Sequence, residues 1–280
     1  MNPRTLMAVV AGLVLVAFGG FYFALKPHAN DALLPPALPP AQTATPSSAA
    51  APPVVVPPPP PPATPASIEA EIALSEHAEL QALLKKNFAA EYDELIAVAV
   101  QRRNEGVSDQ VFGQELAERF EAIMRGKLKY GIGASTPTVD KLAANEASLF
   151  HALSTEGASL CLKMLGKDDG AAAVTATPES VRQLMRLGTL YRFQAIAEGM
   201  PAAKPAEALT SDEMRAFEAS LAREGLNFKD VSTGAYLNNA GTELGKPCRT
   251  LETLHLAIAR LAEGTRRKIY AGMFFLGRDK

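Results

Sequence analysis

Apolar residues recur at helical spacing along most of the chain after Ser67. The first such series is Leu80, Leu84, Phe88, Tyr92 and Ile96, each four residues from the next. An α-helix brings these positions to one face, whereas a half-buried strand needs alternation with a period of two, which is hard to find here. The pattern predicts a mainly α, irregular multi-helix domain over residues 67–280, with about six to nine helices.

Capping signals divide this region into separate helices. One helix is expected over 108–130, with Phe112, Leu116, Phe120, Ile123 and Leu128 on one side and an end at Gly131–Gly133. Start signals follow at Thr136–Pro137, at Thr177–Pro178 and at the capping box from Thr210 to Glu213. The last two helices are expected at 248–264 and 265–277. The uneven intervals favour one domain over a repeat array, with two subdomains meeting near 199–210 as the alternative.

The N-terminus holds an uncharged apolar run of twenty residues, Leu6 to Leu25. As a helix it would span ~30 Å of hydrocarbon, which predicts a transmembrane signal-anchor within residues 1–26. A cleaved secretory leader is the alternative, but its apolar part usually has only ~7 to 15 residues. The aromatic residues Phe21, Tyr22 and Phe23 at the end of the run are typical of a membrane interface, so an uncleaved anchor is favoured.

Residues 27–66 contain fifteen of the 21 prolines and only one acidic residue, Asp31. Such a segment favours polyproline II, and at ~3.1 Å per residue it reaches at most ~120 Å, so we interpret it as a disordered spacer. A ligand for a proline-reading domain is the alternative. The order of anchor, proline-rich spacer and C-terminal domain resembles TonB-type energy-transducing proteins in layout. Their charged Pro-Glu and Pro-Lys repeats are absent here, and the expected domain is helical.

Charge narrows the classes of partner. Of 28 basic and 30 acidic side chains, only Arg4, Lys26 and Asp31 lie before residue 67, which leaves 26 basic and 29 acidic side chains in the domain. This near balance argues against a nucleic-acid surface. The short leader before Leu6 favours a cytoplasmic N-terminus. The expected location is therefore the inner (cytoplasmic) membrane, with a single span and an extracytoplasmic domain, periplasmic in a bacterium.

Cys161 and Cys248 are the only cysteines. In an oxidising compartment an even count favours a disulfide. We predict no metal site, because Cys248 and His255 on one helix would be ~10 Å apart along its axis, too far for one zinc ion. His77, His151 and His255 lack any nucleophile or metal-binding frame and are expected at the surface or its boundary, and no cofactor is predicted.

The stretch "NEASLFHALSTEGA", Asn145 to Ala158, is similar to the helical lytic transglycosylases. The resemblance implies Glu146 as a general acid that protonates a glycosidic oxygen, with Ser154, Gly157 and Ala158 shaping the site. The chain departs from the family pattern at Ala147, where the family has serine, and at "SLCLKML", where it has Gly-Leu-Met-Gln. A plain amphipathic helix bearing Leu149, Phe150 and Leu153 is the competing and favoured interpretation.

The C-terminal segment places three cations, Arg266, Arg267 and Lys268, before a cluster of large apolar residues. These are Ile269, Tyr270, Met273, Phe274, Phe275 and Leu276. One hypothesis makes this helix a partner-binding face with the three cations as contacts. The favoured one docks Ile269, Met273 and Leu276 into the core, because a folded monomer seldom leaves six such groups in water.

These patterns lead to an expected function. The chain is expected to be a membrane-anchored, extracytoplasmic helical interaction or scaffold module in cell-envelope assembly or secretion, held in the lipid bilayer by residues 6–25. Its expected partner is a protein, and no nucleic acid is expected. The alternatives are a lytic-transglycosylase-like enzyme acting on peptidoglycan, and a secreted domain whose leader is cleaved.

Overall fold

The computed structural model describes residues 61–156, 158–165, 177–233 and 245–276, and this part of the chain is mainly helical without a β-strand. The predicted all-α class is therefore confirmed. The predicted membrane span, Leu6 to Leu25, and most of the proline-rich linker lie outside the described residues. None of the described helices is both long enough and apolar enough to cross a bilayer.

The described residues form more helices than the six to nine expected. In chain order these are α2 (Pro65–Ala73), α3 (Ala78–Asn87), α4 (Ala89–Asn104), α5 (Asp109–Lys127), the 3₁₀ helix η1 (Leu128–Gly133), α6 (Thr136–Thr155), α7 (Ala158–Met164), α8 (Glu179–Gly199), the 3₁₀ helix η2 (Met200–Ala202), α9 (Ser211–Arg223), α10 (Phe228–Thr233), α12 (Lys246–Ala259) and α13 (Glu263–Phe275). The predicted domain start at residue 67 falls inside α2.

The capping signals locate the starts of α5, α6, α8 and α9 to within one or two residues. Thr210 and Glu213 form the predicted capping box of α9, in which each side chain accepts a hydrogen bond from the backbone of the other residue. Ser108 caps α5 by accepting from Val111 N. The N-cap of α6 is Ser135, one residue before the predicted Thr136, and that of α8 is Pro178.

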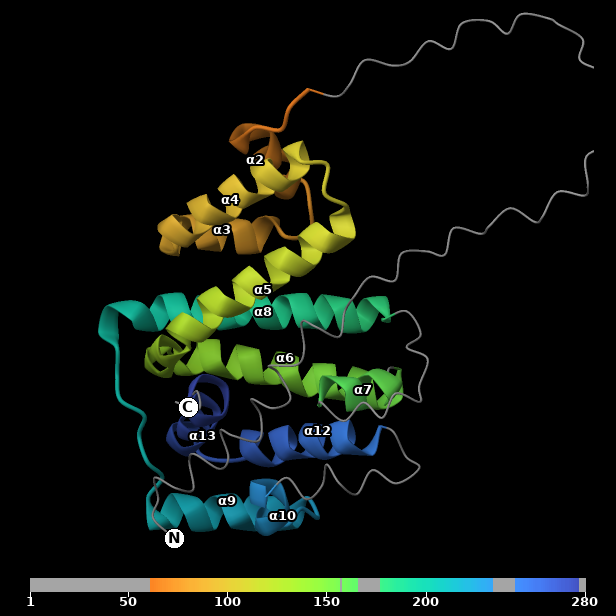
Figure 1. Cartoon of the computed structure of the whole chain (residues 1–280). Coiled ribbons are helices and arrows are strands. Elements are labelled where there is room, and N and C mark those ends of the chain that lie inside the picture. The colour runs from red at the N-terminus through yellow and green to blue at the C-terminus, as the bar shows by residue number, and fades with distance from the viewer. Residues whose placement is uncertain (1–60, 157, 166–176, 234–244, 277–280) are drawn as a thin grey trace, which may run out of the picture.

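The series from Leu80 to Ile96 is buried throughout, but it does not lie on one continuous helix. The chain leaves α-helical geometry at Phe88, with φ −137° and ψ 48°, and α3 and α4 pack against each other (Figure 1). A spacing of four places residues on one face only while the helix continues. The sequence therefore predicted which side chains are buried, whereas the turn at Phe88 determines how they meet.

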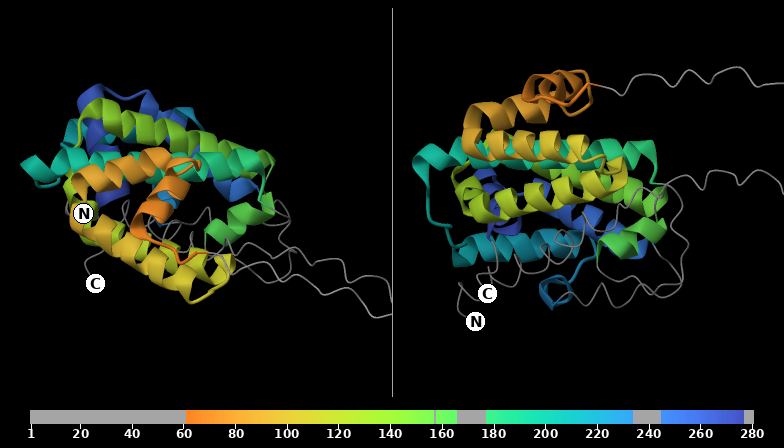
Figure 2. Two further views of the ribbon diagram at one scale, coloured as in Figure 1. Left: turned by 90° about the horizontal axis from the view of Figure 1, so that it is seen from above. Right: turned by 45° about the horizontal axis from the view of Figure 1, so that its top comes forward.

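The helix α8 lies between two hydrophobic cores (Figures 1 and 2). Val181 and Met185 of α8 pack into the first core, which is built by α6, α7, α9, α12 and α13. Phe193 and Ile196 pack into the second core with residues of α2, α3 and α4, against which partly buried residues of α5 pack. Because α8 belongs to both, it joins the α2–α5 unit to the rest of the domain.

Two glycines permit the tightest approaches around η1. A Cβ at Gly199, the last residue of α8, would lie 1.9 Å from the carbonyl oxygen of Tyr130. A Cβ at Gly131 would lie 2.3 Å from the ring of Phe275 in α13. Only glycine fits at these positions, so η1 packs directly against the backbone of α8 at Gly199 and against the Phe275 ring of α13 at Gly131.

Candidate functional site

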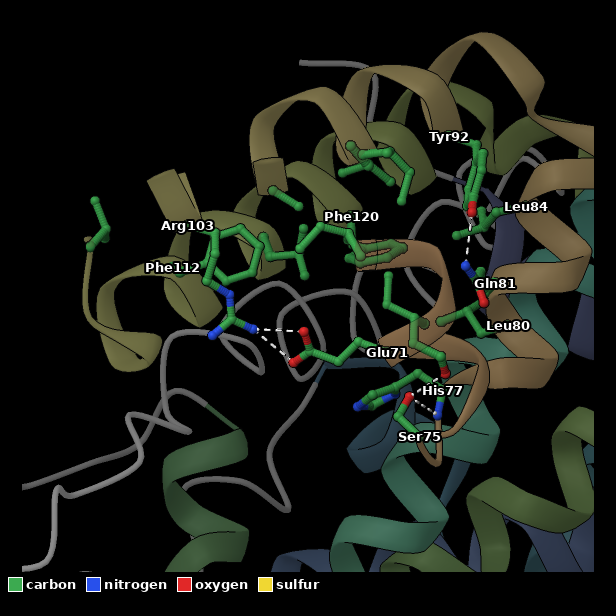
Figure 3. A pocket seen from close by; sticks show the side chains of 17 residues that line it. Glu71, Ser75, His77, Leu80, Gln81, Leu84, Tyr92, Arg103, Phe112 and Phe120 are labelled. Carbon is green, nitrogen blue, oxygen red and sulfur yellow. Dashed lines mark hydrogen bonds and ion pairs between the residues drawn. The ribbon is translucent and has the colours of Figure 1, made fainter. Parts of the chain in front are cut away.

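The second core contains a cavity of about 450 Å³ between α2, α3, α4 and α5 (Figure 3). Its wall is mostly aliphatic and aromatic: Ile68, Ile72, Leu80, Leu84, Tyr92, Leu95, Ile96, Ala99, Val107, Phe112, Leu116 and Phe120. Small-molecule sites in proteins typically have ~300 to 1,000 Å³ and an apolar wall with a few polar groups. The cavity has the size and wall chemistry of such a site.

A turn joins α4 to α5, the helix that supplies one wall of the cavity. Gly106 takes φ +70° in this turn, a conformation that favours glycine, and Ser108 then starts α5. Phe112, Leu116 and Phe120, each four residues apart, form one stripe on α5 that faces the cavity. The sequence predicted this stripe as one face of a helix. It did not indicate that other helices leave the stripe only half-buried.

Polar groups lie at the rim of the cavity. Glu71 accepts two hydrogen bonds from Nη2 of Arg103, at 2.7 and 2.9 Å. At the other side, Gln81 donates to the Tyr92 hydroxyl at 2.8 Å, and this hydroxyl donates to Glu69 at 3.0 Å. Hydrogen bonds from Lys85 and Tyr92 lower the pKa of Glu69, and burial lowers the pKa of the nearby His77. The rim therefore carries the ion pair of Arg103 with Glu71 at one end and the hydrogen bonds among Gln81, Tyr92 and Glu69 at the other.

Two exposed apolar side chains are neighbours in sequence of residues that line the cavity. Among the described residues, the large apolar side chains classed as exposed are Leu74, Val111 and Leu256, and the first two adjoin the cavity-lining residues Ser75 and Phe112 in sequence. Leu74 is 92% exposed.

Glu146, the residue implied as a general acid by the transglycosylase resemblance, is deeply buried on α6. It is 1% exposed and forms an ion pair with Arg192 of α8. Its Oε2 atom has no hydrogen-bond partner among the described residues, and burial raises its pKa although Arg192 acts in the opposite direction. A glycosidic general acid must reach its substrate, whereas Glu146 sits inside the packing of α6 against α8.

The other residues of that resemblance do not assemble around Glu146 into an open site. Ser154 is buried and donates from its hydroxyl to the carbonyl oxygen of His151. Ala158 begins α7, and Gly157 lies outside the described residues. Ser154 follows Glu146 by more than two turns on the same helix, so the two side chains are separated by ~12 Å along its axis. The arrangement matches a buried structural helix.

Cys161 of α7 and Cys248 of α12 are brought to disulfide distance, with their sulfur atoms 2.09 Å and their Cα atoms 6.0 Å apart. Both residues are fully buried in the first core. The described residues contain no cluster of three or more potential metal ligands. The two cysteines therefore link α7 to α12 across a sequence separation of 87.

The three cations of α13 all make contacts within the domain. Arg266 donates to both carboxylate oxygens of Asp140 at 2.8 and 2.7 Å. Arg267 donates to the carbonyl oxygens of Ile132 and Ala134, and Lys268 binds Glu213 at 3.0 Å. Ile269 and Met273 are buried in the first core as the docking hypothesis predicted, together with Tyr270, Phe274 and Phe275, whereas Leu276 is only partly buried against that core. These contacts give the cations a role in holding α13 in place.

The histidines differ in their positions. His77 lies at the cavity rim, and His151 is exposed and binds Glu252 at 2.9 Å. The prediction of a surface or boundary position is wrong for His255, which is 2% exposed and lies among the rings of Phe150, Tyr270 and Phe274. The error arose because a histidine on an apolar helix face gives no signal of its depth. Its Nδ1 has no hydrogen-bond partner among the described residues.

The burial of His255 predicts acid sensitivity. Burial lowers its pKa to about 3, below the ~6.5 of an exposed histidine. The unfolded chain therefore binds a proton that the folded chain does not, so stability is full above pH ~6.5 and falls as the pH drops toward 3. Between pH 7 and pH 4 we expect a loss of about 3 kcal/mol from this group.

Urea unfolding of wild type and His255→Phe across this pH range checks the expectation. The planar phenylalanine ring keeps the aromatic stack but cannot take up a proton, so the variant should lose about 3 kcal/mol less stability than wild type between pH 7 and pH 4. His151→Gln, at an exposed histidine, should keep the wild-type acid sensitivity. Equal acid sensitivity of His255→Phe and wild type would show that His255 is not the responsible group.

Comparisons of the chain with protein-family models, with curated proteins and with solved structures gave no match. The function is therefore inferred from the cavity and from the sequence. Of the residues that the sequence indicated as candidate sites, the structure brings Cys161 and Cys248 together, buries Glu146 against Arg192, and engages Arg266, Arg267 and Lys268 within the domain.

Proposed function

We propose that this chain is a membrane-anchored, extracytoplasmic helical binding module whose binding element is the apolar cavity between α2 and α5. The apolar run from Leu6 to Leu25 supports the anchor, and residues 27–66 supply a spacer. The single observation that carries the binding role is the cavity of about 450 Å³ with an apolar wall and polar groups at its rim. Such a cavity is a default binding site in a protein without a recognised motif.

A peptidoglycan-cleaving activity is not proposed. It would require Glu146 in an open cleft, and Glu146 is buried in an ion pair instead. The binding module remains compatible with a scaffold role in envelope assembly or secretion, since a tethered domain can hold a ligand or partner within the reach of its spacer. The partner or ligand is then recognised chiefly by apolar contact, with orientation set by the polar rim.

The chain has no tryptophan, so one introduced tryptophan is a specific reporter. We expect full-length Phe112→Trp in lipid nanodiscs to transfer excitation energy to the apolar dye anilinonaphthalene sulfonate when the dye enters the cavity. Leu256→Trp, on the surface of α12, should transfer little. Adding Ala99→Phe, which fills the cavity, should abolish most of the signal, because its ring occupies the space available to the dye.

A matched change outside the cavity controls for general effects of a new aromatic ring. Ala144→Phe, at an exposed position of α6, should leave the transfer in Phe112→Trp unchanged. Circular dichroism checks that each variant keeps its helical content. Equal transfer in Phe112→Trp and Leu256→Trp, or transfer that Ala99→Phe does not reduce, would show that the cavity does not bind apolar ligands.

A further inference from the structure

The polar groups at both ends of the cavity are bound to other groups of the domain (Figure 3). At one end Arg103 is bound to Glu71. At the other end the Tyr92 hydroxyl donates to Glu69, which is itself bound to Lys85. A charged ligand would have to compete with these existing contacts, whereas an apolar occupant leaves them in place. The cavity therefore favours an occupant without charged or hydrogen-bonding side chains.

The α5 wall of the cavity is accessible from the surface. Phe112, Leu116 and Phe120 line the cavity and are only half-buried. Grooves with aromatic walls bind proline-containing segments, because the preformed polyproline II conformation loses little entropy on binding. Proline also lacks an N–H group, so it adds no donor that burial would leave unsatisfied. A proline-containing segment with large apolar side chains therefore suits this cavity.

The chain itself contains such a segment before the domain. Residues 32–40, "ALLPPALPP", have no charged or hydrogen-bonding side chain, and they hold all the leucines of the spacer, Leu33, Leu34 and Leu38. In polyproline II, the first and last of these leucines would be ~16 Å apart at ~3.1 Å per residue. The stretch of α4 that lines the cavity, Tyr92 to Arg103, is also ~16 Å long at ~1.5 Å per residue. The leucine segment therefore matches the cavity in length.

The spacer joins the domain beside the cavity. The side-chain amide of Asn104, which follows the cavity-lining Arg103, pairs with the backbone N–H and carbonyl of Ala63. Ala63 follows Leu38 by 25 positions, and at ~3.1 Å per residue this stretch reaches ~80 Å, several times the length of the cavity. A tether of this kind gives an effective concentration on the order of millimolar. The leucine segment is therefore within reach of the cavity of its own chain.

The composition of the intervening stretch favours the leucine segment over the other aliphatic cluster of the spacer. Residues 41–51 are mostly alanine, serine and threonine with one proline, a composition that lets a chain reverse its direction. Val54, Val55 and Val56 are instead separated from the domain by the proline run 57–62. A proline run is semi-rigid over several residues, so it hinders the return of these valines to the cavity.

We infer that residues 32–40 occupy the cavity between α2 and α5 of their own chain, with the three leucines against its aliphatic and aromatic wall. This inference rests on the proposed binding role of the cavity and names its occupant. Docking leaves only residues 26–31 between the predicted anchor and the cavity, ~19 Å at ~3.1 Å per residue, instead of the ~120 Å of the whole spacer. The docked segment therefore holds the domain close to the membrane, and an apolar ligand that displaces it releases the domain to its full reach.

Competition with the apolar dye tests the occupancy. The full-length Phe112→Trp chain, at one copy per nanodisc, is titrated with anilinonaphthalene sulfonate. We expect the leucine variant of this chain, Leu33→Ser/Leu34→Ser/Leu38→Ser, to bind the dye about tenfold more tightly. A tenfold gain corresponds to a segment that fills the cavity in ~90% of the molecules, because a ligand binds only the open fraction.

A valine variant of the same spacer is the matched control. Val54→Ser/Val55→Ser/Val56→Ser also replaces three aliphatic side chains by serine, but at positions that the proline run 57–62 keeps from returning. It should leave the dye affinity of the Phe112→Trp chain unchanged. An equal gain in the valine and leucine variants would overturn the assignment of residues 32–40 to the cavity.

Energy transfer to dansyl-labelled lipid headgroups measures how close the domain lies to the membrane. We expect transfer from Phe112→Trp in the otherwise unchanged chain, and the leucine variant should lose most of it because the domain then moves over the full length of the spacer. Ala99→Phe fills the cavity and should cause the same loss. Ala144→Phe, at the exposed position of α6, should keep the transfer.

The outcomes separate the inference from the proposed function. Unchanged dye affinity in the leucine variant would overturn the inference, while dye transfer in Phe112→Trp would still support a binding cavity. A gain that occurs only in nanodiscs with two copies would make the segment of a second copy the occupant. Tighter dye binding without loss of lipid transfer would overturn the shortened tether. Absence of dye transfer in every chain, the leucine variant included, would reject the proposed function together with the inference.

Discussion

Deletion of residues 265–280 should abolish cooperative folding of the helical domain. The deletion removes five large side chains that α13 buries in the first core: Ile269, Tyr270, Met273, Phe274 and Phe275. At ~1.5 to 3 kcal/mol for each buried side chain, their loss is on the order of 8 to 15 kcal/mol, which equals the whole stability of a typical domain. The truncated chain should show weak helical circular dichroism without a sharp thermal transition.

A shorter deletion separates the packing of α13 from any effect of the chain end. Removal of residues 277–280 alone keeps the whole of α13. The thermal transition of this shorter chain should therefore match that of the full chain. A chain lacking 265–280 that still melted cooperatively at the wild-type temperature would contradict the docked role of α13. It would support the alternative in which Arg266, Arg267 and Lys268 serve a partner.

Loss of the Cys161–Cys248 bond should have the next largest effect on the stability of the domain. The bond closes a loop with a sequence separation of 87, for which the chain-entropy estimate is about 4 to 5 kcal/mol. For a domain of about 200 residues this lowers the melting temperature by on the order of 10 °C. The double variant Cys161→Ala/Cys248→Ala and the reduced wild type should both show this decrease.

The double variant also serves as the control for the reductant. Reductant should lower the melting temperature of the wild type and leave that of Cys161→Ala/Cys248→Ala unchanged. The oxidation state in protein taken from its native compartment tests location as well as bonding. Thiols that alkylate freely there, without added reductant, would refute the bond and would remove its support for an extracytoplasmic domain.

The position of Glu146 illustrates the limit of a local resemblance. The stretch from Asn145 to Ala158 carries the residue types of a known catalytic motif, but the surroundings of Glu146 come from α8, which contributes Arg192 from a distant part of the chain. A local sequence cannot show whether a carboxylate faces solvent or an ion-pair partner. The same reason explains His255, whose aromatic surroundings come from α6 and α13.

The sequence by itself determined the helical class, the starts of α5, α6, α8 and α9, and many of the buried apolar side chains. These features follow from short-range chemistry: the 3.6-residue period selects a face, and a capping residue such as Thr210 satisfies the free N–H groups of the first turn. It also indicated the disulfide pair, because Cys161 and Cys248 have no other cysteine as an alternative. For α13, the concentration of large apolar groups was enough to predict docking.

Only the tertiary structure decided where the packing is incomplete. The helix faces that border the cavity, on α2, α3, α4 and α5, are apolar in the same way as fully covered faces. Whether such a face is covered depends on the angle at which neighbouring helices meet; here α3 and α4 are joined at the break at Phe88, and α4 and α5 by the turn at Gly106. Crossing angles are set by contacts between residues far apart in the chain, so no local pattern records them.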